Sequence, residues 1–427
     1  RREGNPSPAS APRETPSCRY LPVDTSPPTP GALTQGPPPI DEFWRHYLAS
    51  ADAATAELLG QSPDPASPEA LRRRWLAAAS ECSDRFLRSP AFLQAMRQYI
   101  AALVGLGSAP VSASPAPAAS GPPARAATEL LEALDRWSAS CQQLVRESLF
   151  ECRKALDLEA APPGSARTAT PVETVHAEGT MRLLHFQHSR PPRYAEPVVF
   201  CCSLVNRPTI VDLQPRRSVV RHLLDAGFDV YLIDWGVPAP DDCRLDLNDY
   251  QHRLLPAAVG AAQRRAAQSP VTLVGYCMGG TLAAMFAALE PHRVKNLVLM
   301  AAPIDFHVDE SLLALWARPE HFDVDAIVTA FGNCPGALLQ SCFQLMRPVQ
   351  NFAEKYYRLC QRRDDLAFLE NFLAMEQWAS DSVPIAGEAF RQFVQWFYQE
   401  NRLVRGTLTL GGRRVDLSAI ACSLLLL

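Results

Sequence analysis

The sequence has few of the features that mark nucleic-acid-binding or membrane proteins. Only three of its 41 basic residues are lysines, and its formal net charge of −4 provides no basic surface for a nucleic acid or an anionic membrane. No apolar run approaches the roughly 20 residues that a helix needs to cross a bilayer. We therefore expect no nucleic-acid partner and no transmembrane segment.

The cysteines also lack the spacing typical of metal or redox sites. There are 12 of them, scattered along the chain, and no two stand in a C-x-x-C arrangement. Cys201 and Cys202 are adjacent in a predicted strand, where neighbouring side chains point to opposite faces. The pattern predicts reduced thiols in a cytoplasmic protein, with no metal and no cofactor.

Proline divides the chain into segments. Residues 1–39 combine proline with small polar residues and almost no large apolar ones, a composition that predicts disorder. A second such stretch, 107–124, predicts a linker. Residues 40–106 and 125–168 carry apolar and aromatic side chains at helical spacing, the latter ending in a short linker. Because these helices hold no convergent polar cluster, we expect them to pack or to dock a partner.

Strands and helices alternate beyond residue 168. This order predicts an α/β fold with a mostly parallel sheet and helices on both faces. Residues 306–400 have helical patterns and aromatic clusters, which predicts a helical lid inserted into a domain spanning 169–427. The predicted strands cover 180–187, 197–203, 229–234, 271–274, 296–302, 407–410 and 414–417, with a last one from about 420, and the helices cover 218–226, 247–268 and 280–289.

Cys277 stands at a predicted sharp turn between a buried strand and a helix. Gly275 and Gly279 flank it at G-x-C-x-G spacing, where side chains would collide with the strand or the helix. The free N–H groups and dipole at the start of the following helix favour a thiolate and an oxyanion. We therefore expect Cys277 to be a nucleophile, with a small buried cysteine as the alternative.

From about residue 169 the sequence resembles polyhydroxyalkanoate synthases, most closely the catalytic subunit of the two-subunit, class III type. The helical stretch 41–106, with FLRSPAFLQAM at 86–96, is similar to the non-catalytic partner subunit of the same enzymes. The blocks that carry the main resemblance are LVNRPTIVDLQP at 204–215, AGFDVYLIDWG at 226–236, GYCMGG at 275–280, VKNLVLMAAPIDF at 294–306, AGEAFRQF at 386–393 and LGGRRVDLSAI at 410–420.

The resemblance implies an α/β-hydrolase-type fold and an acyltransferase that polymerises (R)-3-hydroxyacyl-coenzyme A (CoA). Cys277 matches the family's nucleophile, which accepts the acyl group as a thioester and releases CoA. The backbone N–H of Met278 and one from the Val205–Asn206 loop would then hold the oxyanion. Expected partners are the acyl-CoA substrate, a second synthase subunit or another copy of the chain, and the surface of cytoplasmic polyester granules.

The family's catalytic aspartate and histidine have no counterpart in this sequence. Both would follow the strand that here ends in SLLLL, so we expect a chain truncated at its C-terminus and inactive alone. Asp305 and His307 follow the predicted strand after the turn, and Asp234 ends the strand before it. All three are possible substitutes, but Asp305 and His307 better fit a role at the lid entrance. Two alternatives stay open: a thiol hydrolase or thioesterase on the same fold, and a non-catalytic granule or partner-binding protein.

Overall fold

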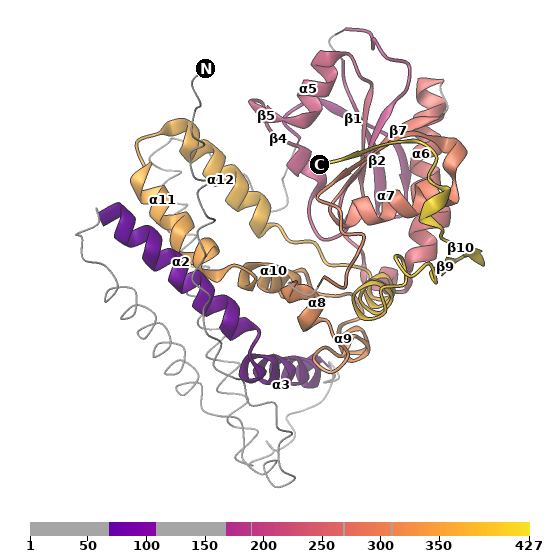
Figure 1. Cartoon of the computed structure of the whole chain (residues 1–427). Coiled ribbons are helices and arrows are strands. Elements are labelled where there is room, and N and C mark those ends of the chain that lie inside the picture. Colours follow the sequence, from indigo (N-terminus) through magenta and orange to yellow (C-terminus); the bar gives the residue numbers. More distant parts are fainter. Residues whose placement is uncertain (1–67, 108–167, 189, 268–269, 309–310) are drawn as a thin grey trace, which may run out of the picture. The chain divides into compact units, whose positions relative to one another are not determined.

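The computed structural model describes residues 68–107, 168–188, 190–267, 270–308 and 311–427 (Figure 1). The predicted segments 1–39 and 107–124 fall outside these residues except for Gly107, and residues 40–67 and 125–167 lie outside them altogether. None of the described helices has both the length and the apolar character needed to span a bilayer.

A mostly parallel sheet organises the region from residue 172 onward. Its seven strands lie in the order β1-β2-β6-β3-β7-β8-β11. The β1/β2 and β2/β6 pairs are antiparallel, while β6/β3, β3/β7, β7/β8 and β8/β11 are parallel, as the sequence predicted. The strands are β1 (Val172–Glu178), β2 (Met181–Phe186), β3 (Val198–Cys201), β6 (Val230–Asp234), β7 (Val271–Tyr276), β8 (Val294–Met300) and β11 (Ser423–Leu426).

Alternation along the central strands supplies two cores, one on each face of the sheet. In β6, Val230 and Leu232 pack with Val220 of α5 (Val219–Ala226), whereas Tyr231 and Ile233 face the other core. That second core holds α6 (Leu255–Ala266) and α7 (Met278–Leu289), and all residues of α7 are buried. Period-two alternation of apolar side chains on both faces explains why these strands have continuous hydrophobic sequences.

Local signals set the ends of the helices between the strands. Ser218 caps α5 by accepting a hydrogen bond from the Arg221 N–H at 2.8 Å, and Gly227 ends it in the left-handed region with φ 95°. Such a conformation costs glycine little because it has no Cβ. The helix predicted over 218–226 is thereby confirmed.

Two details of the predicted sheet are wrong. The stretches at 407–410 and 414–417 do not rejoin the main sheet, because β9 (Thr409–Leu410) and β10 (Arg413–Arg414) pair only with each other. Leu417 instead begins a 3₁₀ turn, η8 (Leu417–Ala419). The edge strand β1 was not predicted, since its mixed sequence VETVHAE leaves most of its side chains partly or fully exposed.

The region predicted as a lid is helical, and two N-terminal helices pack on it. Trp316 of α8 (Leu312–Trp316) donates its indole N–H to the Leu87 carbonyl at 3.0 Å, at the end of α2 (Pro68–Leu87). Leu93 of α3 (Pro90–Gly107) joins the same buried cluster. The other lid helices are α9 (Val324–Phe331), α10 (Gly336–Leu345), η6 (Val349–Glu354), α11 (Lys355–Gln361), α12 (Leu366–Ser380), α13 (Gly387–Phe393) and η7 (Val394–Gln399).

Short elements complete the described chain. They are η2 (Pro208–Val211), β4 (Asp212–Gln214), β5 (Arg217–Ser218), η3 (Pro240–Arg244), the π-helical turn η4 (Asp249–Leu254) that leads into α6, and η5 (Pro291–Arg293).

Candidate functional site

Cys277 lies at the turn between β7 and α7, at the carboxyl end of a central strand. Its backbone has φ 54° and ψ −130°, a strained conformation for a residue with a side chain. The Cys277 N–H donates to the Met300 carbonyl of β8 at 3.0 Å, and its carbonyl accepts from the Gly280 N–H at 2.8 Å. The predicted strand, turn and helix are confirmed, although α7 begins at Met278 rather than Gly280.

The two glycines that flank the turn are needed because backbones approach closely. A Cβ on Gly275 would lie 2.5 Å from the Gly280 Cα, and one on Gly279 would overlap the carbonyl oxygens of Cys201 and Cys202. The end of β3 therefore packs directly against the first turn of α7, which brings the loop after β3 close to Cys277.

Burial works against ionisation of the thiol. It raises the pKa of Cys277 above the usual value, although hydrogen bonds from the Met278 backbone N–H and the Ser203 side chain favour the thiolate. The N–H groups and dipole at the start of α7 lower the pKa of a thiol there, as the sequence predicts. For Cys277 the loss of hydration raises the pKa by more than they lower it. The thiol consequently needs a base to take its proton.

The loop after β3 brings a residue to the thiol that the sequence did not single out. The buried Ser203 hydroxyl favours the Cys277 thiolate and thereby limits the rise in the pKa of the thiol. It also accepts a hydrogen bond from the Val205 N–H at 3.3 Å. The sequence held one weak signal for it, namely its place at the end of the strand predicted over 197–203, although β3 itself ends at Cys201. Val205 is buried beside Ser203, and Asn206 forms an isolated antiparallel bridge with Ser382.

The last turn of α12 and the segment that follows it hold the same loop in place. The Val383 N–H donates to the Val205 carbonyl at 3.3 Å, and the Trp378 indole N–H donates to the Arg207 carbonyl at 2.8 Å. The Arg207 guanidinium also pairs with Asp381 at 3.1 Å, with both side chains about four-fifths buried. The position of the Val205–Asn206 loop is thus coupled to the lid.

The residues considered as substitutes for a catalytic dyad have other partners. Asp305 accepts hydrogen bonds from the His307 backbone N–H at 3.0 Å and the Asn401 side chain at 2.8 Å. The His307 imidazole donates from Nε2 to the Tyr398 carbonyl at 3.0 Å. Asp234 accepts from the Gly236 N–H at 3.0 Å. No hydrogen bond joins any of these three side chains to Cys277 in the described residues.

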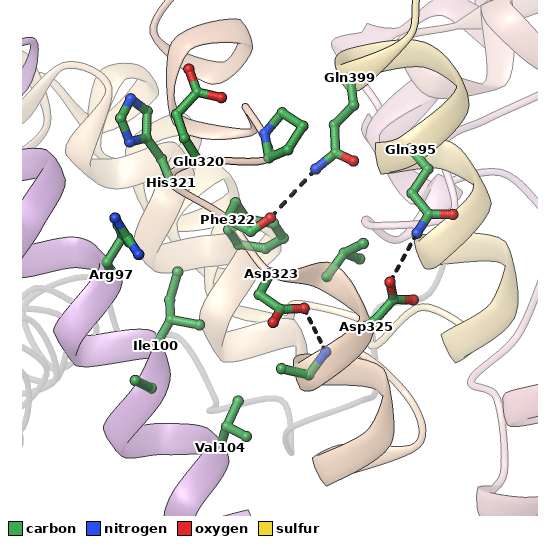
Figure 2. Close-up of a pocket in the computed structure, with 14 residues that line it drawn as sticks. Arg97, Ile100, Val104, Glu320, His321, Phe322, Asp323, Asp325, Gln395 and Gln399 are labelled. Carbon is green, nitrogen blue, oxygen red and sulfur yellow. Dashed lines mark hydrogen bonds between the residues drawn. The ribbon is translucent and has the colours of Figure 1, made fainter.

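A pocket of about 560 Å³ lies elsewhere, between α3, the start of α9 and η7 (Figure 2). Several of its polar groups already have partners within the protein. Asp323 caps α9 through the Ala326 N–H at 2.9 Å, and Gln395 donates to Asp325 at 3.2 Å. Cys277 does not line this pocket, nor do the other predicted site residues.

Comparisons with known proteins agree with the fold. Residues 196–401 match the family model described as "alpha/beta hydrolase fold". The chain is 44% identical over 256 residues to the poly(3-hydroxyalkanoate) polymerase subunit PhaC of Haloferax mediterranei, covering 60% of this chain and 52% of that protein. The proteins of the same name from Synechocystis sp. and Allochromatium vinosum are 42% identical over 260 residues and 38% identical over 274.

The extent of these matches differs between relatives. The chain spans about half the length of the Haloferax protein. It covers 69% of the Synechocystis protein and 75% of the Allochromatium protein, with 60% and 63% of its own length in the two matches. The chain belongs to the family of poly(3-hydroxyalkanoate) polymerase subunits.

Proposed function

We propose that this chain is an acyltransferase that builds polyhydroxyalkanoate from (R)-3-hydroxyacyl-CoA, with Cys277 as the residue that accepts the acyl group. One observation carries the proposal: a cysteine holds the strained turn between β7 and α7 in a chain of this family. A thiolate is strongly nucleophilic and a good leaving group, so a cysteine suits repeated exchange between thioesters and esters.

The proposed first step exchanges one thioester for another. The Cys277 Sγ loses its proton and attacks the thioester carbonyl of the substrate, forming a new carbon–sulfur bond. The bond from the acyl carbon to the CoA sulfur then breaks, and CoA leaves with a proton. In the second step a hydroxyl group attacks the acyl-cysteine, which forms an ester and frees the thiol for the next monomer.

We assign the oxyanion site to backbone N–H groups at the ends of β3 and β7. The Met278 backbone N–H favours negative charge on the Cys277 sulfur, so it is close enough to serve an oxyanion that forms next to that sulfur. Val205 and Asn206 supply the second donor in this proposal. The Val205 N–H now donates to Ser203 at a long 3.3 Å, a bond that a developing oxyanion would readily replace.

The chain by itself should turn over slowly. Burial raises the pKa of Cys277, and within the described region the hydrogen bonds to its sulfur come from Met278 and Ser203 rather than from an imidazole. Removing a general base typically costs a factor of about 10² to 10⁴ in rate. Acylation of the cysteine should therefore be measurable under single-turnover conditions while polymer formation is poor.

We also propose a partner and a location for this chain. The relatives are named as polymerase subunits, so a second subunit is a proposed partner, with another copy of the chain as the alternative. We propose that residues 40–106 and 125–168 serve this association and that 169–427 form the synthase domain. The cytoplasm and the surface of polyester granules are the proposed locations.

The test is release of CoA from 3-hydroxybutyryl-CoA with enzyme in excess. The unaltered chain and Cys243→Ala should each release CoA from the bound substrate, up to one CoA for each Cys277 that is acylated. Cys277→Ala should release CoA only at the uncatalysed rate. Equal release by Cys277→Ala would contradict the proposal. Accumulation of free 3-hydroxybutyrate instead of enzyme-bound acyl groups would identify a thioesterase.

A further inference from the structure

Two histidines and an aspartate converge at the edge of the sheet opposite Cys277. His185 belongs to β2, His188 follows that strand, and the buried Asp229 immediately precedes β6. β6 and β7 both run parallel to β3, so their carboxyl ends lie at one edge and Asp229 lies at the other. The proposed acyl transfer makes no use of this cluster.

The three side chains present their ligand atoms to one small volume. The Nε2 atoms of His185 and His188 lie 2.8 and 2.7 Å from the same Asp229 oxygen, Oδ1. All three ligand atoms lie within 4.8 Å of one another, and the side chains are 14%, 13% and 10% exposed. Within the described ranges, this is the one such group of three metal-ligating side chains.

A second layer of groups holds these ligands in place. Glu173 of β1 lies 3.2 Å from the His185 Nδ1, and Arg265 of α6 pairs with Glu173 at 2.8 Å. Tyr231 donates its hydroxyl to Asp229 Oδ2 at 3.0 Å and stacks on the His185 ring with a centroid distance of 4.5 Å. A carboxylate behind a ligating histidine is a recurrent feature of metal sites, because it fixes the tautomer and raises the basicity of the ring.

We propose that His185, His188 and Asp229 form a binding site for a divalent transition-metal ion of the zinc type. Two imidazoles and a carboxylate suit zinc, which binds nitrogen and oxygen at about 2.0–2.2 Å and prefers tetrahedral geometry. Ligand atoms around such an ion lie roughly 3.3 Å apart. The two imidazole–carboxylate distances would thus open by about half an ångström as the ion replaces the hydrogen-bonded protons.

Protons and the metal ion compete for this site. Both imidazoles must be neutral to bind the ion, so binding releases protons and weakens as the pH falls. Since the ion would join β2, the segment after it and the start of β6, its effect is to stabilise the fold rather than to take part in catalysis.

The experiment titrates the metal-free 427-residue chain with Zn²⁺ by calorimetry at pH 7.5 and 5.5. We expect one high-affinity site at pH 7.5, a melting temperature that rises with bound Zn²⁺, and weaker binding at pH 5.5. His188→Ala should abolish the site, and Glu173→Gln should weaken it roughly tenfold, the lower end of effects seen for such supporting carboxylates. His292→Ala is the matched control, because its side chain is 75% exposed and distant in sequence from the site.

Co²⁺ separates this site from the thiols of the chain. Bound to imidazole and carboxylate, Co²⁺ gives visible ligand-field bands without the near-ultraviolet charge-transfer band that thiolate ligands produce. Absence of one-to-one binding, a thiolate-type spectrum, or equal affinity in His188→Ala would overturn the proposal. If His188→Ala does not fold, the spectrum and the pH dependence of the unaltered chain decide the question on their own.

Discussion

At the scale of single residues, two opposing effects set the pKa of Cys277. Its place at the start of α7 favours the thiolate, while burial raises the pKa of the thiol and prevails. The hydrogen bonds from Met278 and Ser203 offset part of the cost of burial. The reactivity of this cysteine therefore depends on its immediate neighbours as well as on the turn that presents it.

Replacing Ser203 by alanine should make the thiol less acidic. A hydrogen bond contributes about 0.5–1.5 kcal/mol, and one pKa unit corresponds to about 1.4 kcal/mol, so the pKa of Cys277 should rise by roughly half a unit to one unit. Below the pKa the thiolate fraction, and with it the rate of alkylation by iodoacetamide, should fall roughly three- to tenfold. Mass spectrometry of the peptide that contains Cys277 gives this rate as a function of pH.

The control for Ser203→Ala is Ser418→Ala, because the Ser418 hydroxyl bonds to Asp416 in an exposed turn. Ser418→Ala should leave the pH profile of Cys277 alkylation where it is. The same profile in Ser203→Ala and the unaltered chain would show that the serine has no influence on the thiol.

At the scale of secondary-structure elements, the site depends on how closely β3, β7 and α7 approach one another. Gly279 lets the first turn of α7 lie against the carbonyls of Cys201 and Cys202 at the end of β3. The lid adds a second constraint, since Asp381, Trp378 and Val383 all bond to the loop that follows β3. The turn and the loop are consequently held in one arrangement from two sides.

Gly279→Ala should destabilise the protein and disturb the site together. Its Cβ would meet two backbone carbonyls that cannot rotate away, so we expect the free energy of unfolding to fall by at least about 2 kcal/mol. Gly105→Ala is the control, because a Cβ there meets nothing within 4 Å. As glycine is a weaker helix former than alanine, that variant should gain about 0.5–1 kcal/mol in α3. Urea unfolding measures both, and equal stabilities would contradict the close packing.

The sequence predicted the elements whose signals are local. The apolar runs of β6 and β7, the Gly227 stop of α5 and the glycines around Cys277 all identify their structures without tertiary information. Other features could not be predicted, because they depend on contacts between residues far apart in the sequence. Gly411 and Gly412 predict the hairpin itself, but nothing local shows that Thr409–Leu410 pairs only within it rather than with the main sheet.

The candidate site shows the same division between local and long-range information. The turn at Cys277 follows from a short motif and could be predicted. The role of Ser203 and the raised pKa of the thiol arise from burial and from neighbours contributed by other strands. The cluster of His185, His188 and Asp229 joins residues up to 44 positions apart and became visible only once β2 and β6 were paired.

At the scale of the whole molecule, the N-terminal helices and the lid share a buried cluster. Leu87 and Leu93 pack with Leu312 and Trp316, and the Trp316 indole bonds to the Leu87 carbonyl. Arg72 of α2 also lies over the Tyr357 ring of α11, with 4.2 Å from its guanidinium carbon to the ring centroid. Changes in α2 or α3 should therefore alter the packing of the lid helices.

Leu93→Ala tests whether this packing belongs to the cooperative fold. Truncating a buried leucine usually costs about 2–5 kcal/mol, and Leu93 is 8% exposed. Leu366→Ala is the control, since Leu366 is 61% exposed and should cost no more than about 0.5 kcal/mol. Urea unfolding followed by circular dichroism gives both values. A Leu93→Ala variant as stable as the control would mean that α3 contributes little to the fold.

The central claim is that Cys277 carries the acyl group, and detection of that intermediate tests it most directly. The 427-residue chain is incubated with 3-hydroxybutyryl-CoA, quenched in acid to preserve thioesters, digested and analysed by mass spectrometry. The account predicts a 3-hydroxybutyryl group on the peptide that contains Cys277, removable by neutral hydroxylamine and missing in Cys277→Ala. An acyl group found only on another residue, or an unmodified Cys277 peptide while CoA is released, would contradict the account.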